Sequence, residues 1–203
     1  MSVTQRAIRG TRVVLRSKQV SDAANDFAWR TDPELATLDA THPLQQTFQE
    51  YLRQYQEELR YPSPWSERFA IETLDGEHIG NCMCYDINTA RGEAEMGIMI
   101  GRKDFWNRRY GYDALLTLID DTFGSTSLRL LYLHTLESNT RAQRCFQRCG
   151  FTPVSLIRRQ GWKLVRMDLP RPQWYQIRSQ CLALLEQQPP ATPSPTPPGP
   201  LQR

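Results

Sequence analysis

The sequence contains no long apolar run. No stretch of its 203 residues approaches the roughly 20 apolar residues that a membrane-spanning helix needs, so we expect no membrane partner. The opening MSVTQRAIRGTRVVLR also lacks the apolar segment of a signal peptide. These two absences together predict a cytoplasmic protein.

Net charge and metal-binding side chains are also scarce. A formal charge of +3 is too small to indicate a nucleic-acid partner, and the arginines are scattered among acids. Of the five cysteines, Cys82 and Cys84 share one face of an expected strand, where a disulfide between them would be strained. Cys145 and Cys149 have helical spacing, and only His134 is near enough in sequence to complete a metal site. We therefore expect structural thiols and no metal.

Composition divides the chain in two. Residues 187–203 are dominated by Pro, Ser and Thr, which predicts a disordered tail. Residues 1–186 hold the apolar side chains needed for a single domain.

The pattern over residues 12–169 is mixed α/β. Alternation predicts seven strands, and helical spacing predicts four helices. Ser21 is the expected N-cap of the first helix, Thr47 and Glu50 form a capping-box pattern before the second, and Gly150 is expected to end the fourth. A helix between two strands predicts one parallel crossover, from Glu95 to Leu136, in a largely antiparallel sheet.

The segment GIMIGRKDFWNRRYGYDALLTLIDDTF, residues 97–123, reads as strand, Arg-rich turn and helix. The free N–H groups and the dipole of a helix N-terminus attract anions, and arginine suits phosphate. Gly111 has no Cβ to obstruct a ligand. A solvated turn with surface arginines is the alternative interpretation of these residues.

The same segment resembles the acetyl-CoA-binding segment of the GNAT N-acetyltransferases, in the branch that acetylates ribosomal-protein N-termini. The matching positions are Glu95, Gly97, Ile98, Ile100, Trp106, Tyr110, Gly111 and Ala114. A second block, ESNTRAQRCFQRCGF, is similar to another family segment through Asn139, Ala142, Gly150 and Phe151. The resemblance implies a GNAT-like domain with about seven strands and about four helices, as a monomer or homodimer.

The resemblance also implies the cofactor site. Phosphates of acetyl-CoA would lie against Asn107, Arg108, Arg109, Tyr110, Gly111 and Tyr112. The pantetheine arm would pair like an added strand with Ile98, Met99 and Ile100, in a cleft where this strand splays from the strand that ends near Leu136, and it would contact Asn139. Arg109 stands where the family has its first loop glycine, so a positive φ there would be strained, and Asn107 stands at another usual glycine.

Acetyl transfer to an amine requires a proton acceptor, a donor to the oxyanion and a proton for the thiolate. Glu95 is the expected acceptor, directly or through water, with Glu93 as the alternative. A backbone N–H at residues 98–100 is the expected oxyanion donor. Gly97 indicates either a strand bulge, which would free such an N–H, or a close backbone approach, and an unbroken sheet is the alternative. His134 reads as a core or sheet-edge residue rather than a base.

The sequence does not identify the group that protonates the departing CoA thiolate. Many relatives carry Tyr where Phe146 stands and others Ser where Ala142 stands, so Cys145, Ser138 or water would supply the proton. Residues 31–47 would form part of the acceptor wall, and Arg158, Arg159 and Trp162 could border it. No dense acidic pocket is evident, which disfavours polyamines. A protein α-amine is slightly preferred, and a small primary amine is possible.

The leading hypothesis is therefore an acetyl-CoA-dependent N-acetyltransferase acting in a ternary complex. The alternative is a catalytically weak CoA-binding sensor or scaffold, which Arg109, Ala142 and Phe146 make credible.

Overall fold

A computed structural model describes residues 6–186. The eight strands are β1 (Ala7–Arg9), β2 (Val13–Ser17), β3 (Glu67–Thr73), β4 (His78–Asn88), β5 (Glu93–Ile100), β6 (Leu130–Leu136), β7 (Thr152–Arg159) and β8 (Trp162–Pro170). The six α-helices are α1 (Ala23–Thr31), α2 (Pro33–Leu38), α3 (Phe48–Arg60), α4 (Tyr110–Ser125), α5 (Thr140–Arg148) and α6 (Arg171–Glu186). Short 3-10 turns span Val20–Asp22 and Lys103–Phe105. The predicted tail at 187–203 lies outside the described residues.

All eight strands form one sheet in the order β1-β2-β3-β4-β5-β6-β8-β7. Every neighbouring pair is antiparallel except β5 and β6, which are parallel and joined by the crossover through α4. This confirms the predicted mixed, mostly antiparallel sheet of a single α/β domain, with one strand and two helices more than expected.

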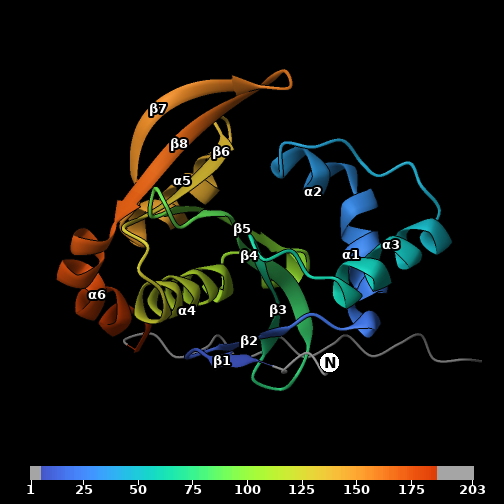
Figure 1. Ribbon diagram of the computed structural model, residues 1–203, viewed down its shortest axis with the longest axis horizontal. Helices are drawn as coiled ribbons and strands as arrows, with labels where there is room; N and C mark the ends of the chain where they lie inside the picture. Colours follow the sequence, from blue (N-terminus) through green and yellow to red (C-terminus); the bar gives the residue numbers. More distant parts are fainter. Residues whose placement is uncertain (1–5, 187–203) are drawn as a thin grey trace, which may run out of the picture.

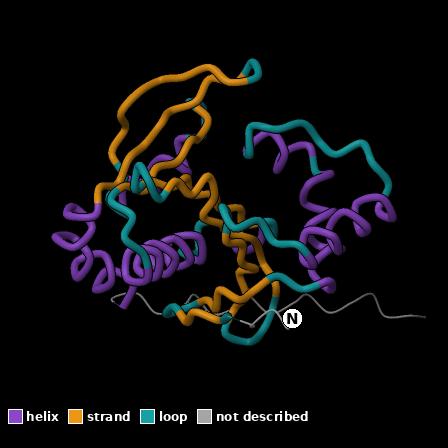
Figure 2. The backbone as a smooth tube through the Cα atoms, viewed as in Figure 1, coloured by secondary structure: helices purple, strands orange, loops and turns teal. Residues whose placement is uncertain are grey.

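The helices lie in two groups beside the sheet (Figure 1). Helix α4 contacts β1, β2, β4 and β5 and buries its apolar face against them, while α6 contacts α4 and β8. Helices α1, α2 and α3 gather at the other side of the molecule, and the β7–β8 hairpin curves away from the rest of the sheet (Figure 2).

Local signals at helix ends account for several confirmed boundaries. Thr47 accepts a hydrogen bond from the Glu50 N–H, and Glu50 reaches back to the Thr47 N–H, completing the capping box. Gly150 follows α5 with φ +95°, a conformation that favours glycine at a helix end.

The Ser21 prediction was wrong. Gln19 caps the 3-10 turn, and α1 begins only at Ala23. Asp22 decides this, because its carboxylate accepts hydrogen bonds from the Gln19 N–H and from Arg16 and so fixes the turn. The pattern also missed the short elements β1 and α2 and the helix α6.

A buried carboxylate joins α4 to the first strands. Asp113, which is 1% exposed, accepts hydrogen bonds from the backbone N–H groups of Thr11, Arg12 and Val13 at 3.2, 2.6 and 3.0 Å. Gly10 permits this approach, since a Cβ there would lie 2.8 Å from the Asp113 carboxylate. The start of α4 is thereby held against β2.

Replacing Asp113 by alanine would leave the buried N–H groups of Arg12 and Val13 without an acceptor. We expect Asp113→Ala to lower the free energy of unfolding by about 3 kcal/mol or more, because each unpaired buried donor costs about 1–3 kcal/mol. Urea denaturation measures the loss, with Asp75→Ala in the exposed β3–β4 turn as the control. A change no larger than that of the control would contradict this role.

Candidate functional site

Strands β5 and β6 pair over only a short length. Their parallel register joins Glu93, Ala94 and Glu95 to Leu130, Leu131 and Tyr132. Beyond this point β5 continues beside β4, and β6 continues beside β8. Since backbone groups of alternate residues face opposite neighbours, some N–H and C=O groups of β5 beyond Glu95 face β6 without pairing to it.

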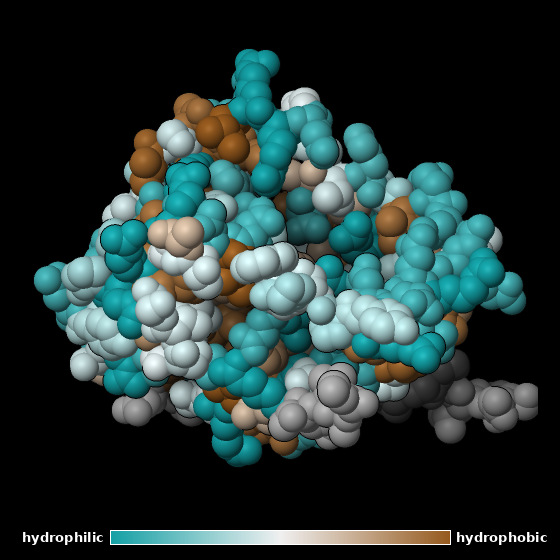
Figure 3. Space-filling model, in the orientation of Figure 1, coloured by the Kyte–Doolittle hydropathy of each residue, from teal (hydrophilic) through white to brown (hydrophobic). Residues whose placement is uncertain are grey.

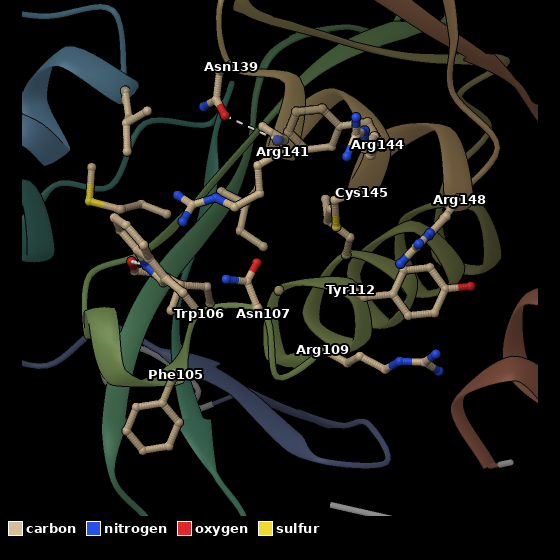
Figure 4. A pocket seen from close by; sticks show the side chains of 18 of the residues that line it. Phe105, Trp106, Asn107, Arg109, Tyr112, Asn139, Arg141, Arg144, Cys145 and Arg148 are labelled. Atoms are coloured by element: carbon tan, nitrogen blue, oxygen red, sulfur yellow. Dashed lines mark hydrogen bonds between the residues drawn. The ribbon is translucent and has the colours of Figure 1, made fainter. Parts of the chain in front are cut away.

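A cleft of about 880 Å³, called here the splay cleft, opens where the two strands diverge. Strand β5 contributes Ile98, Met99 and Ile100, and the start of α4 and the face of α5 form the opposing walls (Figure 4). Trp106 lies at its edge and donates from Nε1 to the Ile100 carbonyl at 2.7 Å.

The loop before α4 is held in a left-handed conformation. Asn107 has φ +59° and Arg109, the N-cap residue of α4, has φ +66°. These are the two positions at which the resemblance places glycine. Arg109 directs its guanidinium toward α6 and donates to the Leu184 carbonyl at 2.7 Å (Figure 4).

Most of the residues predicted to bind the cofactor line the splay cleft. They are Ile98, Met99, Ile100, Asn107, Arg109, Gly111, Tyr112 and Asn139. Two others, Arg108 and Tyr110, do not line it; Arg108 stacks on the rings of Phe105 and Tyr110 instead. Their contact with a ligand stays a prediction, as it does for the lining residues.

Sequence reasoning missed three arginines on α5. Arg141, Arg144 and Arg148 all line the splay cleft, and Arg141 stacks 3.7 Å above the Trp106 ring centroid (Figure 4). Their spacing of three and four residues puts them on one side of a helix, which is the signal that could have revealed them. Together with Arg109 they give this cleft positive charge.

The apolar stripe of α5 also reaches the cleft. Phe146 is 7% exposed and packs on Phe151, and Cys145 lies beside it in the lining. A hydrogen bond with the Cys149 thiol, helped by the charges of Arg148 and Arg141, holds the pKa of Cys145 below its ordinary value despite its burial. Ser138 is exposed outside the lining, so Cys145 is the better placed of the two proposed acids.

A second cavity of about 390 Å³ lies on the opposite face of β5. It is called here the hairpin pocket, because Arg159 and Trp162 of the β7–β8 hairpin form one wall. The visible face is hollowed between this hairpin and α2 (Figure 3). Asp39, Ile98 and Met99 line both cavities, so the two meet where β5 leaves β6.

Glu95 is buried beside the hairpin pocket, at 2% exposure. His134 Nδ1 lies 2.8 Å from Glu95 Oε1, and Tyr85 is also hydrogen-bonded to this carboxyl. Arg159 Nη2 stands 3.7 Å away. Burial favours the neutral acid, but these hydrogen bonds and the Arg159 charge outweigh it, so the pKa of Glu95 lies below its ordinary value.

The ionised carboxylate fixes the histidine tautomer. A carboxylate can only accept hydrogen bonds, so Nδ1 of His134 carries the hydrogen that it donates to Glu95. Neither Glu95 nor His134 lines the hairpin pocket, whereas Tyr85 does. Tyr85 therefore connects the pocket to Glu95.

The predicted bulge at Gly97 was wrong. Gly97 pairs regularly with Met83, and the irregularity in this ladder lies between Tyr85 and Asn88. A Cβ at Gly97 would lie 3.3 Å from the Met83 side chain, so close packing explains the glycine. Free backbone groups on β5 arise from its divergence from β6 and not from a bulge.

The sequence model of the family described as "Acetyltransferase (GNAT) domain" matches residues 12–152, more than two thirds of the chain. The chain belongs to the GNAT acetyltransferases. No curated protein matches it.

Solved structures share this GNAT fold. A spermidine N-acetyltransferase from Vibrio cholerae, in complex with CoA and spermine, superposes with a TM-score of 0.73 at 19% identity, over 81% of this chain and 99% of that one. A putative acetyltransferase from T. thermophilus superposes with a TM-score of 0.75 at 18% identity, over 91% of this chain and 100% of that one. A GCN5-related N-acetyltransferase from Brucella melitensis superposes with a TM-score of 0.73 at 16% identity, over 91% of this chain and 87% of that one. Identities this low establish the fold alone.

Within residues 6–186, no helix combines the length and the apolar character that spanning a bilayer requires. The same residues contain no cluster of three or more His, Cys, Asp or Glu side chains that could hold a metal ion.

Arg109 allows strain to be separated from charge at the start of α4. A side chain in the left-handed region costs about 1–2 kcal/mol, which glycine avoids. We expect Arg109→Gly to be about 1 kcal/mol more stable than Arg109→Ala, since both lose the bond to Leu184 and only the glycine relieves the strain. Chemical denaturation of the two variants gives the difference, and equal stabilities would show that the loop relaxes without cost.

Proposed function

We propose that this GNAT domain transfers an acetyl group from acetyl-CoA to a primary amine in a ternary complex. One observation carries the proposal: two cavities on opposite faces of β5 meet at Ile98 and Met99, beside a strand edge left open by β6. Such an arrangement lets two substrates enter from opposite sides and react where the cavities join.

The splay cleft suits a phosphate-bearing thioester. Arg109, Arg141, Arg144 and Arg148 supply charge for phosphates, and guanidinium groups bind them bidentately. Open backbone groups at residues 98–100 would pair with an amide-containing arm as an added strand does. The Asn139 side chain accepts from the Ala142 N–H at 3.1 Å, which leaves its amide N–H groups free to donate to that arm.

When bound, acetyl-CoA supplies a thioester whose acetyl carbon an amine can attack. Glu95 would receive the amine's proton, through water or the Tyr85 hydroxyl, because Tyr85 lines the hairpin pocket and bonds to Glu95. His134 would hold the carboxylate in place and share the incoming charge. A free N–H of β5 would stabilise the oxyanion, and Cys145 or water would protonate the leaving thiolate.

The hairpin pocket would take the acceptor. A protein N-terminal α-amine is slightly preferred on the resemblance to the ribosomal-protein branch, and a small-molecule amine is possible. A second candidate function, a catalytically weak CoA-binding sensor, is favoured by the apolar Phe146 ring at the position where many relatives carry a tyrosine hydroxyl.

Acetyl-CoA binding tests the cleft. A hundredfold excess of acetyl-CoA over its dissociation constant should add about 2.7 kcal/mol of apparent stability in a thermal-shift assay. Arg144→Gln should weaken binding about tenfold, since a charge-assisted hydrogen bond is worth about 1.5–3 kcal/mol. Arg53→Gln, on the exposed side of α3, is the control with the same loss of charge. No thermal shift at millimolar acetyl-CoA would remove both candidate functions.

The role of Glu95 is tested by Glu95→Gln. Because the pKa of Glu95 is lowered, its carboxyl is ionised at neutral pH and becomes protonated only at a pH below its ordinary pKa. The variant should lower kcat about 100-fold or more while sparing acetyl-CoA affinity. Thiol release with an amine panel measures this effect. An unchanged kcat would show that Glu95 is not the proton acceptor. If the native chain releases no thiol with any amine, the sensor function is favoured.

A further inference from the structure

The hairpin pocket contains more charge than transfer to a simple amine requires. Four side chains of charged types line it: Asp26 and Asp39, Arg30 and Arg159. Asp26 is already engaged, because Lys18 Nζ lies 2.7 Å from it and Asn81 and Tyr55 donate to it. One carboxylate and two guanidinium groups are then left to meet a ligand.

Arg30 is the first of these guanidinium groups. Its Nε is buried without a hydrogen-bond partner, and no ion pair within residues 6–186 includes Arg30. Because Nε is closed off from the cavity, a ligand would meet the remaining N–H groups of this guanidinium, which no hydrogen bond or ion pair within residues 6–186 engages and which are not buried. An anionic oxygen is the group that satisfies a guanidinium best.

Arg159 faces the same space from the hairpin. Its nearest described charge is Glu95, at 3.7 Å from Nη2, which is beyond hydrogen-bond distance. Half of its side chain is exposed, so its N–H groups remain accessible to a ligand. Arg30 and Arg159 come from α1 and β7 and thus place positive charge on two different walls.

Asp39 stands at the junction of the two cavities. The surrounding protein displaces part of the water around its carboxyl and raises its pKa, and the Arg30 charge opposes this shift. No hydrogen bond or ion pair among the described side chains engages this carboxylate. It is placed to meet an amine that approaches the divergence of β5 and β6.

We propose that the acceptor is a primary amine that also carries a carboxylate, with the carboxylate held by Arg30 and Arg159 and the amine beside Asp39. This inference rests on the proposed function and names its substrate class. The volume of about 390 Å³ suits a small ligand or the first residues of a peptide. Trp29 and Trp162 supply apolar walls between the charged groups.

A polyamine fits this pocket poorly. Its second ammonium would meet Arg30 or Arg159 in place of an acid, and juxtaposed like charges disfavour binding. We therefore do not expect this domain to share a polyamine acceptor with the spermidine N-acetyltransferase whose fold it resembles.

A matched series of acceptors tests the proposal. 5-Aminopentanoate, pentylamine and cadaverine have the same chain length and differ in the group at the far end. Thiol release should give 5-aminopentanoate a kcat/KM at least tenfold above that of either amine. Alanyl-glutamate and alanyl-glutamine repeat the comparison in peptide form and show whether the carboxylate comes from a small molecule or a peptide. Equal or better turnover of cadaverine would overturn the proposal.

The preference should depend on Arg30. Arg30→Gln should reduce the advantage of the carboxylate-bearing acceptor at least fivefold while leaving acetyl-CoA affinity unchanged. Arg158→Gln is the control, because Arg158 neighbours Arg159 on β7, is exposed and does not line the pocket. A preference that survives in Arg30→Gln, or is lost equally in Arg158→Gln, would count against the assignment.

Calorimetry on the CoA-saturated protein separates this inference from the proposed function. If the native chain binds 5-aminopentanoate more tightly than cadaverine and Arg30→Gln abolishes the difference, the ligand class stands even without turnover. If thiol release occurs but neither compound is preferred, the acetyltransferase assignment stands and the ligand class fails.

Discussion

The divergence of β5 from β6 after Glu95 is the constraint on which the site depends. A continuous sheet would pair every backbone group of β5 and would separate its two faces. Because β6 instead follows β8, residues 98–100 keep an open edge, and Ile98 and Met99 line the cavities on both faces. Asp113 contributes to this geometry at a distance, since it holds the start of α4 against β2 and so fixes the floor of the splay cleft.

The two faces of β5 carry different chemistry, and strand alternation is the reason. Ile98 and Ile100 face α4, toward the arginine-lined cleft, whereas Glu95 and Gly97 face the hairpin side. The carboxylate is thereby kept apart from the arginines of α5, which would otherwise pair with it. Only Arg159 approaches Glu95 from its own side among the described cations, and His134 and Tyr85 occupy the nearer positions.

Features fixed by a few neighbouring residues could be predicted from the sequence. The capping box at Thr47, the glycine end of α5 and the alternation of β5 are of this kind, and so was the strand–turn–helix at residues 97–123. Features that depend on distant partners could not. Helix α6 is stabilised by burial of Trp174, which is 0% exposed. Arg30 lines a cavity only because the distant β7–β8 hairpin forms the opposite wall. Asp22 likewise displaced the predicted cap at Ser21 through its partner Arg16.

The two cavities differ in how far family membership constrains them. The GNAT match ends at residue 152, so it includes β5, α4 and α5, which form nearly all of the splay cleft. Arg159 and Trp162 lie beyond it, and the opposite wall of the hairpin pocket comes from residues 26–41 near the other end of the chain. His42 and Trp162, with ring centroids 5.7 Å apart, join these two distant segments. Substitutions in the hairpin can therefore change the hairpin pocket while the cleft proposed for acetyl-CoA stays intact, whereas Asp39 of the other segment lines both cavities. Family membership thus fixes the fold and the kind of reaction more firmly than the acceptor.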